Sequence, residues 1–371
     1  MLRPVSDQAE GKGKDAGAGT PRPVDSIRVS SGTMSVFGLS RARPETAPTT
    51  AYLMVGERCL MDCAFCSQAR SAATSAEMLS RVSWPACDNQ VVVQAAAAAK
   101  ETGQIGRVCF QMVAGRETWE RTRQAVLELR AASAVPICVS ATASNLKQVE
   151  EILEWGSSRV TLALDAAAER IYSEVKGGGS WRARWYLLRA AAGRFPGRIG
   201  THLIVGLGET EREMLETIQA CLDMGATVAL FAFTPVRGTR MQAAPPPDPA
   251  AYRRIQAAHF LMKNGLVRLA DMQFDSDGRL VSFGKPVEEV KALLVGGDAF
   301  RTSGCKDCNR PYYNEHPGGF MYNHPRPLTA DEATEAIELT LSGIRDTASS
   351  PAVSGSPVSP SSPRQATGEA R

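Results

Sequence analysis

Short apolar runs rich in β-branched residues alternate with longer amphipathic segments through the middle of the chain. The runs predict strands, and the longer segments predict helices with charged residues on one face. We expect strands at 52–55, 108–113, 136–140, 159–164, 201–205, 228–233 and 267–274. We expect helices at 118–132, 145–155, 209–224 and 249–264. Repeated strand-then-helix units form a parallel sheet, so the pattern predicts an α/β fold, a (βα)8 or incomplete TIM-type barrel.

The ends of the chain have a different composition from its middle. Residues 1–48 are rich in Gly, Pro, Ala, Ser and charge, and residues 347–371 repeat Ser, Pro and Ala. Both compositions are typical of disorder, which predicts a disordered leader and a disordered tail. Between them we expect the barrel at 49–300 and, at 301–346, a C-terminal extension with a Cys-x2-Cys pair and a helix.

Charge and cysteine content narrow the class of protein. The 371 residues carry a formal net charge of +3, and the basic residues are scattered, so we expect no nucleic-acid partner. No stretch approaches 18 uninterrupted apolar residues, so we expect no membrane span. The chain has nine cysteines and opens without the apolar core of a signal peptide. Thiols or metal ligands in the cytoplasm are therefore expected rather than disulfides.

The motif with the most specific chemistry follows the first predicted strand. It reads Cys59-Leu-Met-Asp-Cys63-Ala-Phe65-Cys66. Three thiolates at this spacing can bind three irons of a cubane 4Fe-4S cluster and leave the fourth iron open. An open iron can chelate an amine and a carboxylate, and a reduced cluster can pass an electron to a sulfonium, which suggests S-adenosylmethionine (SAM) as the ligand. Phe65 is then expected to pack near the adenine.

With this spacing and this aromatic residue, the chain resembles the radical SAM superfamily. The competing interpretation is a structural zinc site, in which Cys63 and Cys66 pair with Cys305 and Cys308. Zinc requires four such ligands, and this pairing leaves Cys59 unused.

Other candidates for cofactor binding end the predicted strands, whose loops gather at one mouth of a barrel. Asp165 could accept hydrogen bonds from a ribose, or could cap the following helix. Ile204, Gly206 and Glu209 belong to a Gly-rich turn that enters a helix, where backbone can approach a ligand or simply make a tight connection. The carboxylate of Glu117 could bind the methionyl amine.

Two cysteines inside predicted strands, Cys109 and Cys138, could be small buried side chains. Their order relative to the triad, the Gly-rich turn and Arg268 also resembles biotin synthases over residues 50–275. The resemblance implies a second, auxiliary iron–sulfur cluster held by three strand cysteines and an arginine. Cys109, Cys138 and Arg268 fall on three of these positions, whereas the third cysteine is missing and His202 is the nearest substitute.

The C-terminal block adds a feature that biotin synthases lack, the pair Cys305-Lys-Asp-Cys308. Two such thiolates suit an iron–sulfur cluster, zinc or a redox dithiol. If they bind a cluster, Cys109 or Cys138 could supply a third ligand, provided that the block folds over the barrel mouth. Four more residues of the block could close the pocket and neutralise a negative charge. They are Arg310, Tyr312, Tyr313 and Arg326.

A biotin-synthase-like barrel with this added pair resembles the two-component lipoyl synthases. These enzymes share sulfur insertion into an octanoyl chain between two radical SAM proteins. The resemblance implies a sulfurtransferase in which a 5′-deoxyadenosyl radical removes hydrogen from an unactivated C–H and the carbon radical attacks a cluster sulfide. We favour this function over biotin synthesis. Alternatives are a radical SAM lyase or mutase without sulfur donation, and a zinc-stapled binding protein.

The partners that this function implies are a small-molecule or carrier-bound acyl substrate and an electron donor such as flavodoxin or ferredoxin. A second radical SAM subunit would be a further partner.

Overall fold

The computed structural model describes residues 26–315 and 319–346. Its centre is an eight-stranded sheet in the order β10-β9-β8-β7-β6-β2-β1-β5. Along the chain these strands are β1 (Ser26–Val29), β2 (Thr50–Val55), β5 (Ala86–Asp88), β6 (Arg107–Met112), β7 (Ile137–Ser140), β8 (Arg159–Thr161), β9 (Ile199–Val205) and β10 (Thr227–Ala232). The six strands from β2 to β10 are parallel, as predicted.

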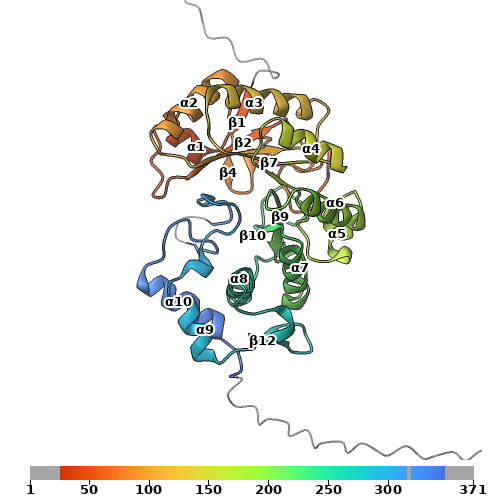
Figure 1. Ribbon diagram of the computed structural model, residues 1–371, viewed down its shortest axis with the longest axis vertical. Helices are drawn as coiled ribbons and strands as arrows, with labels where there is room; N and C mark the ends of the chain where they lie inside the picture. The colour runs from red at the N-terminus through yellow and green to blue at the C-terminus, as the bar shows by residue number, and fades with distance from the viewer. Residues whose placement is uncertain (1–25, 316–318, 347–371) are drawn as a thin grey trace, which may run out of the picture.

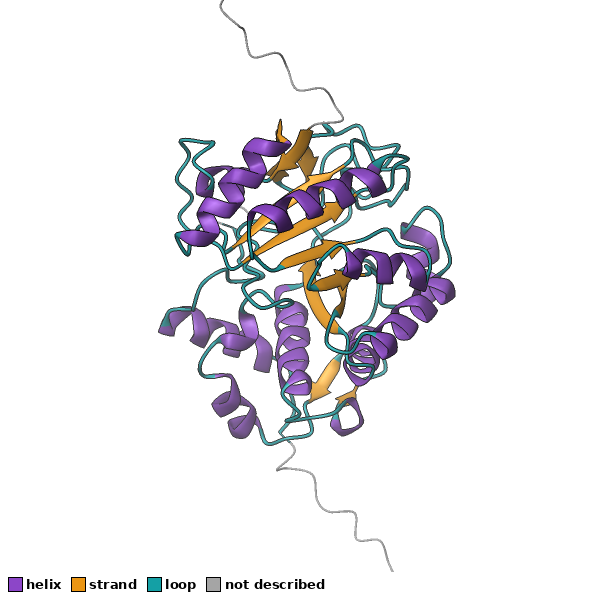
Figure 2. Cartoon of the chain, turned by 45° about the horizontal axis from the view of Figure 1, so that its top comes forward, coloured by secondary structure: helices purple, strands orange, loops and turns teal. Residues whose placement is uncertain are grey.

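Helices follow most of the parallel strands, and Figure 2 shows these helices packed around the strands of the sheet. They include α2 (Asn89–Glu101), α3 (Thr118–Ala132), α4 (Leu146–Glu154), α5 (Glu169–Val175), α6 (Trp181–Arg194), α7 (Glu211–Asp223) and α8 (Pro249–Lys263). All six residues of β2 are buried, as expected of a parallel strand covered on both faces. In the described residues β5 and β10 are the edges of the sheet, so the observed architecture is the incomplete form of the predicted barrel.

The predicted helices agree closely with the structure because their end signals are local. Helix α3 has the predicted bounds, and α8 begins at Pro249 behind the N-cap Asp248. Helix α7 begins with a capping box between Thr210 and Glu213. Each signal satisfies N–H groups that the first turn of a helix leaves without partners.

The predicted disordered leader is wrong for residues 26–48. Strand β1 pairs with β2 and β5, and α1 (Ser31–Val36) follows it. Ile27 and Val29 are almost fully buried, so this short strand contributes two apolar side chains to the core. Residues 1–25 and the predicted tail 347–371 lie outside the described residues.

The strand predicted at 267–274 is also wrong. Leu269–Asp271 forms a 3-10 turn, η2, because the Asp271 carboxylate accepts a hydrogen bond from the Arg268 N–H at 2.7 Å. Only β11 (Gln273–Phe274) is extended, and it pairs with β12 (Leu280–Ser282) in a separate sheet. Figure 1 shows β12 below α7 and α8, away from the main sheet.

The remaining elements are short hairpin strands and the C-terminal helices. They are β3 (Met78–Leu79), β4 (Val82–Ser83), α9 (Val287–Leu294), the 3-10 turn η3 (Asp298–Phe300) and α10 (Ala330–Leu341). Helix α10 packs on α8 through Ala333, Ala336 and Ile337, which are buried. In the described part of the chain, no helix is long and apolar enough to cross a membrane.

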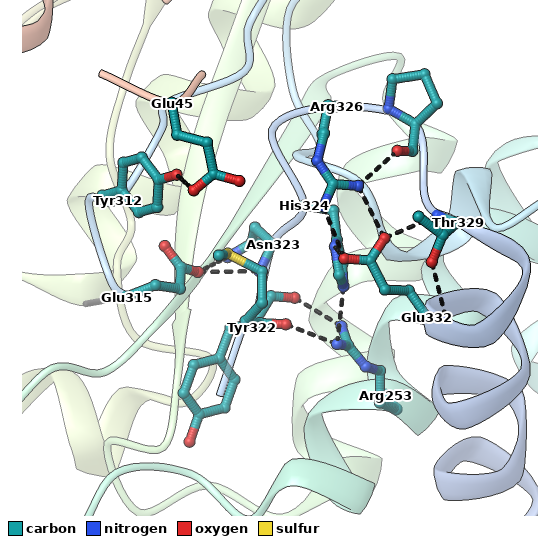
Figure 3. A network of polar contacts seen from close by, with 12 residues as sticks. Glu45, Arg253, Tyr312, Glu315, Tyr322, Asn323, His324, Arg326, Thr329 and Glu332 are labelled. Atoms are coloured by element: carbon teal, nitrogen blue, oxygen red, sulfur yellow. Dashed lines mark hydrogen bonds and ion pairs between the residues drawn. The ribbon is translucent and has the colours of Figure 1, made fainter. Parts of the chain in front are cut away.

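The C-terminal block is fastened to both α8 and α10 (Figure 3). Arg253 of α8 donates to the main-chain oxygens of Met321 and Tyr322 at 2.6 and 2.7 Å. Arg326 makes two hydrogen bonds of 2.8 Å to Glu332 in the first turn of α10. The block is thereby fixed to both helices.

Candidate functional site

The cysteine triad lies on the triad loop, residues 56–77, directly after β2. Two arginines bind the main-chain oxygens of this loop and so fix its path. Arg58 donates to the oxygens of Ser67, Ala69, Ala72 and Thr74. Arg28 of β1 donates to the oxygens of Glu57 and Ala76 and to the Gln68 side chain. The ordered β1 strand therefore has a role at the site that the sequence did not indicate.

Of the triad thiols, Cys63 is buried, and Cys59 and Cys66 are partly buried. Burial raises the pKa of Cys63 above its ordinary value and that of Cys66 to about 12. The N–H groups of Ala114 and Gln68 donate to the sulfur atoms of Cys59 and Cys66 at 3.3 and 3.4 Å. Thiols on one ordered loop, with N–H donors to sulfur, are the donor set that a cubane cluster requires.

A front cavity of about 160 Å³ opens beside the third cysteine. Cys66, Phe65, Asp165 and Ile204 line it, so three of the predicted cofactor residues lie together next to the triad. Asp165 lies in the loop between β8 and α5, where its backbone has a φ of 65°. Its carboxylate forms an ion pair with Lys176. The other wall residues include the apolar Leu79, Phe231, Phe233 and Val236 and polar residues such as Gln111, Thr234 and Asn314.

Three other predicted cofactor contacts, Glu117, Gly206 and Glu209, do not line this cavity. The Glu209 carboxylate accepts hydrogen bonds from the N–H groups of Gly206 and Leu207 at 2.6 and 3.0 Å, which closes the turn before α7. Gly206 packs against Pro247 instead of a ligand space. Glu117 is exposed at the start of α3.

A deep cavity of about 30 Å³ lies behind the front one, and four cysteines line it: Cys109, Cys138, Cys305 and Cys308. Cys109 and Cys138 are register partners on β6 and β7. The Cys138 thiol forms hydrogen bonds with the thiols of Cys109 and Cys305, and the bond to Cys109 raises its pKa. The sulfur of Cys308 lies 3.5 Å from the Tyr52 hydroxyl. The structure thus gathers thiols from two strands and from the C-terminal block.

Close main-chain contacts bring the block to the strands. The side chain of Asp307 lies where a Cβ on Gly106 would be, at 2.7 Å, so the block can approach only because residue 106 is glycine. Thr49 and Thr50 donate to the main-chain oxygen of Asp307 at 2.7 Å. Cys305 and Cys308 consequently lie with Cys109 and Cys138, and not with Cys63 and Cys66 as the zinc interpretation requires.

The arginine at the deep cavity is Arg310, and the predicted ligand Arg268 is wrong. The Arg268 side chain is 63% exposed and pairs with Asp223 at 2.9 Å, because the chain turns outward at η2. Arg310 is buried, donates to the main-chain oxygens of Leu230 and Ser303, and lies 4.0 Å from the centre of the Phe231 ring. The expectation that Arg310 closes a pocket agrees with its position.

Four side chains line both cavities and form the partition between them: Gln111, His202, Phe231 and Arg310. Burial lowers the pKa of His202 to about 4, so its imidazole is neutral near pH 7. His202 lies edge-to-face on Phe231, with ring centres 5.1 Å apart. His202 therefore faces the thiol side of β9, as a substitute ligand would have to, although the block already supplies cysteines there.

Sequence reasoning missed Gln111, Phe231 and Lys176 at this site. The one signal for Lys176 is its position between an apolar helix end and three glycines. Within residues 26–315 and 319–346, no group of three or more His, Cys, Asp or Glu side chains is placed to hold a metal ion. The ligands of an iron–sulfur cluster bind different irons and need not surround a single ion. Both groups of cysteines therefore still offer the thiol donors that such a cluster requires.

Known proteins resemble this chain over the region that contains the cysteine triad. The family model described as Radical SAM superfamily matches residues 53–221. A biotin synthase of Synechococcus sp. (strain JA-3-3Ab) is 27% identical over 223 residues, which are 57% of this chain and 68% of that protein.

Two solved structures are also similar in part. HydG, the FeFe-hydrogenase maturase of Carboxydothermus hydrogenoformans, has 18% identity and a TM-score of 0.46, covering 58% of this chain and 52% of its own. Methylornithine synthase (PylB) has 11% identity and a TM-score of 0.45, covering 67% and 79%. This chain thus spans about half the length of the HydG structure.

Proposed function

Residues 53–221 of this chain belong to the radical SAM superfamily, and from that premise we propose that the protein inserts sulfur into an unactivated C–H bond of an acyl chain. One observation carries the proposal. The cavity beside the triad and the cavity with four further cysteines adjoin, with only the partition between them. A substrate at the partition would touch a hydrogen-abstraction site on one side and a sulfur source on the other.

The superfamily implies a 4Fe-4S cluster and SAM. We assign Cys59, Cys63 and Cys66 as the cluster ligands, and Phe65 and Asp165 as contacts of the adenosyl part. When bound, this pair of cofactors supplies the 5′-deoxyadenosyl radical that abstracts hydrogen. The chain contributes orientation and exclusion of water, because Phe65, Ile204 and Phe233 give part of the front cavity an apolar wall.

We assign Cys109, Cys138, Cys305 and Cys308 as ligands of an auxiliary iron–sulfur cluster, which would supply the inserted sulfide. Four thiols are a complete donor set for such a cluster. Arg310 supports the assignment, since its guanidinium is buried at the same cavity and would balance the negative charge of thiolates and sulfide.

The walls of the front cavity favour an uncharged aliphatic substrate. Its charged lining residues are Asp165 and Arg310, and both are already engaged, Asp165 by Lys176 and Arg310 by main-chain oxygens. A substrate carboxylate would have no free cation among these lining residues. We therefore propose a lipoyl synthase-like reaction on an octanoyl chain presented by a carrier protein or peptide.

A biotin synthase-like reaction is the second candidate, because the curated relative named above is a biotin synthase. Either reaction requires electrons, and we propose a flavodoxin or ferredoxin as their donor. For the lipoyl reaction we also propose a second radical SAM subunit as a partner. We place the protein in the cytoplasm, where its nine unpaired cysteines would stay reduced.

Reconstitution of the full chain with iron and sulfide under anaerobic conditions tests the proposal. We expect about eight irons per chain, falling to about four in Cys305→Ala/Cys308→Ala, as two cubane clusters require. The reconstituted protein is then given SAM, dithionite and an octanoyl-lysine peptide or dethiobiotin, and the products are examined by mass spectrometry. Cleavage of SAM without any sulfur-containing product or intermediate from either substrate would reject sulfur insertion by this chain itself and favour a lyase or mutase.

A further inference from the structure

The C-terminal end of α5 is docked against the triad loop by its backbone. The Ala64 N–H donates to the Val175 main-chain oxygen at 2.6 Å. Gly177 then turns away with a φ of +62°, and a Cβ there would lie 2.1 Å from the Asp62 oxygen. Only glycine fits both conditions, so Lys176 between these contacts has a fixed position beside the second triad cysteine.

The side chain of Lys176 links the triad to the proposed cofactor contact. Its ammonium forms the ion pair with Asp165 and a hydrogen bond with the Cys63 thiol. It also lies 5.8 Å from the centre of the Phe65 ring. The side chain is only 13% exposed, so little water screens its charge.

A buried cation in this position favours electron uptake by the triad. A cubane cluster with three thiolates is negatively charged, and reduction adds one more negative charge. Attraction between opposite charges a few Å apart is worth several times more in a protein site than in bulk water. Asp165 opposes this effect in part because it neutralises the same ammonium.

We propose that Lys176 is a positioning residue that raises the reduction potential of the triad cluster and orients Asp165 toward the front cavity. The inference rests on the triad cluster of the proposed function and not on sulfur donation. It concerns the permanent charge of Lys176, which Lys176→Arg keeps and Lys176→Met removes.

The test measures the midpoint potential of the triad cluster by EPR-monitored titration without SAM. All variants are made in the Cys305→Ala/Cys308→Ala background, so that the triad cluster is observed by itself. We expect Lys176→Met to lower the ratio of reduced to oxidised cluster about tenfold at fixed potential, a shift of about 59 mV to more negative values for one electron. Lys176→Arg should stay near the parent.

Arg240→Met is the matched control, because Arg240 pairs with Asp62 at 2.6 Å on the same loop but is 48% exposed. Removal of the Arg240 charge should leave the potential of the triad cluster near that of the parent, since solvent screens this exposed guanidinium. Asp165→Asn should shift the potential to more positive values, and it gives a second reading if Lys176→Met binds too little iron. Equal potentials in the parent, Lys176→Met and Asp165→Asn would overturn the inference.

Failure of the inference and failure of the proposed function remain distinguishable. A parent without the cluster signal would reject the triad assignment itself. A parent with the signal but without the expected shifts would reject only the role of Lys176.

Discussion

The thiol of Cys138 in β7 shares a hydrogen bond with the thiol of Cys305 in the C-terminal block. This bond and burial raise the pKa of Cys305 above its ordinary value, so both groups are neutral thiols without a metal. A strand of the sheet and a segment that follows α9 therefore complete the same cavity. Binding of iron at this cavity would release their protons.

The first prediction concerns these four cysteines as one site. Cys138→Ala should lose about as much iron as Cys305→Ala, about four per chain, because both thiolates would bind the same auxiliary cluster. Iron and sulfide content after anaerobic reconstitution is the measurement. Cys87→Ala is the control, since that thiol contacts Met34 at the edge of the sheet. Normal iron in Cys138→Ala would remove the strand cysteine from the ligand set.

The second prediction compares the two arginines. Arg310→Ala should lower the free energy of unfolding by about 3 kcal/mol, because two buried main-chain oxygens lose a charged donor. Arg268→Ala should change it by less than about 1 kcal/mol, as is usual for an exposed ion pair. Urea denaturation of the metal-free chain under reducing conditions measures both. Similar effects of the two substitutions would contradict the assignment of Arg310 to the deep cavity.

The third prediction concerns the predicted SAM contacts. Asp165→Asn should weaken SAM binding by about tenfold, which corresponds to the loss of one charged hydrogen bond of about 1.4 kcal/mol. Glu117→Gln should leave the affinity unchanged, because Glu117 is exposed at the start of α3. Equilibrium dialysis of the reconstituted protein with labelled SAM gives both affinities. Weaker binding in Glu117→Gln would show that the Glu117 carboxylate contacts SAM, although it does not line the front cavity.

The fourth prediction concerns stability at acid pH. His259 in α8 is buried, its Nε2 has no partner in the described residues, and burial lowers its pKa from 6.5 to about 4. The unfolded chain therefore takes up a proton near pH 6.5 that the folded chain refuses until about pH 4. This stabilising contribution is complete above pH 6.5 and is lost as the pH falls toward 4.

Between pH 7.5 and 5 the loss from His259 should be about 2 kcal/mol. His259→Phe should reduce the difference in the free energy of unfolding between these two pH values by that amount, as measured by urea denaturation. An unchanged pH dependence in His259→Phe would show that the folded chain protonates this histidine normally.

Sequence patterns determined the parts of the fold that depend on neighbouring residues. Helix α3 follows from the periodicity of its own segment, and the start of α8 follows from Pro249 and the N-cap Asp248. The triad motif is likewise local, since the spacing of Cys59, Cys63 and Cys66 places three thiols on one loop. The short strand β1 escaped prediction because four residues carry too little pattern, and its stability comes from its neighbours β2 and β5.

Only the tertiary structure decided which distant residues share a cavity. Cys138 meets Cys305 because β7 has a fixed register in the sheet and because Gly106 leaves space for Asp307 of the block. Arg310 replaces Arg268 because the chain turns outward at η2 and returns only after α9. The sequence by itself determined which chemical groups are available, since spacing and capping act over a few residues. Packing across the sheet determined which groups meet, because such contacts depend on the register and closure of the whole fold.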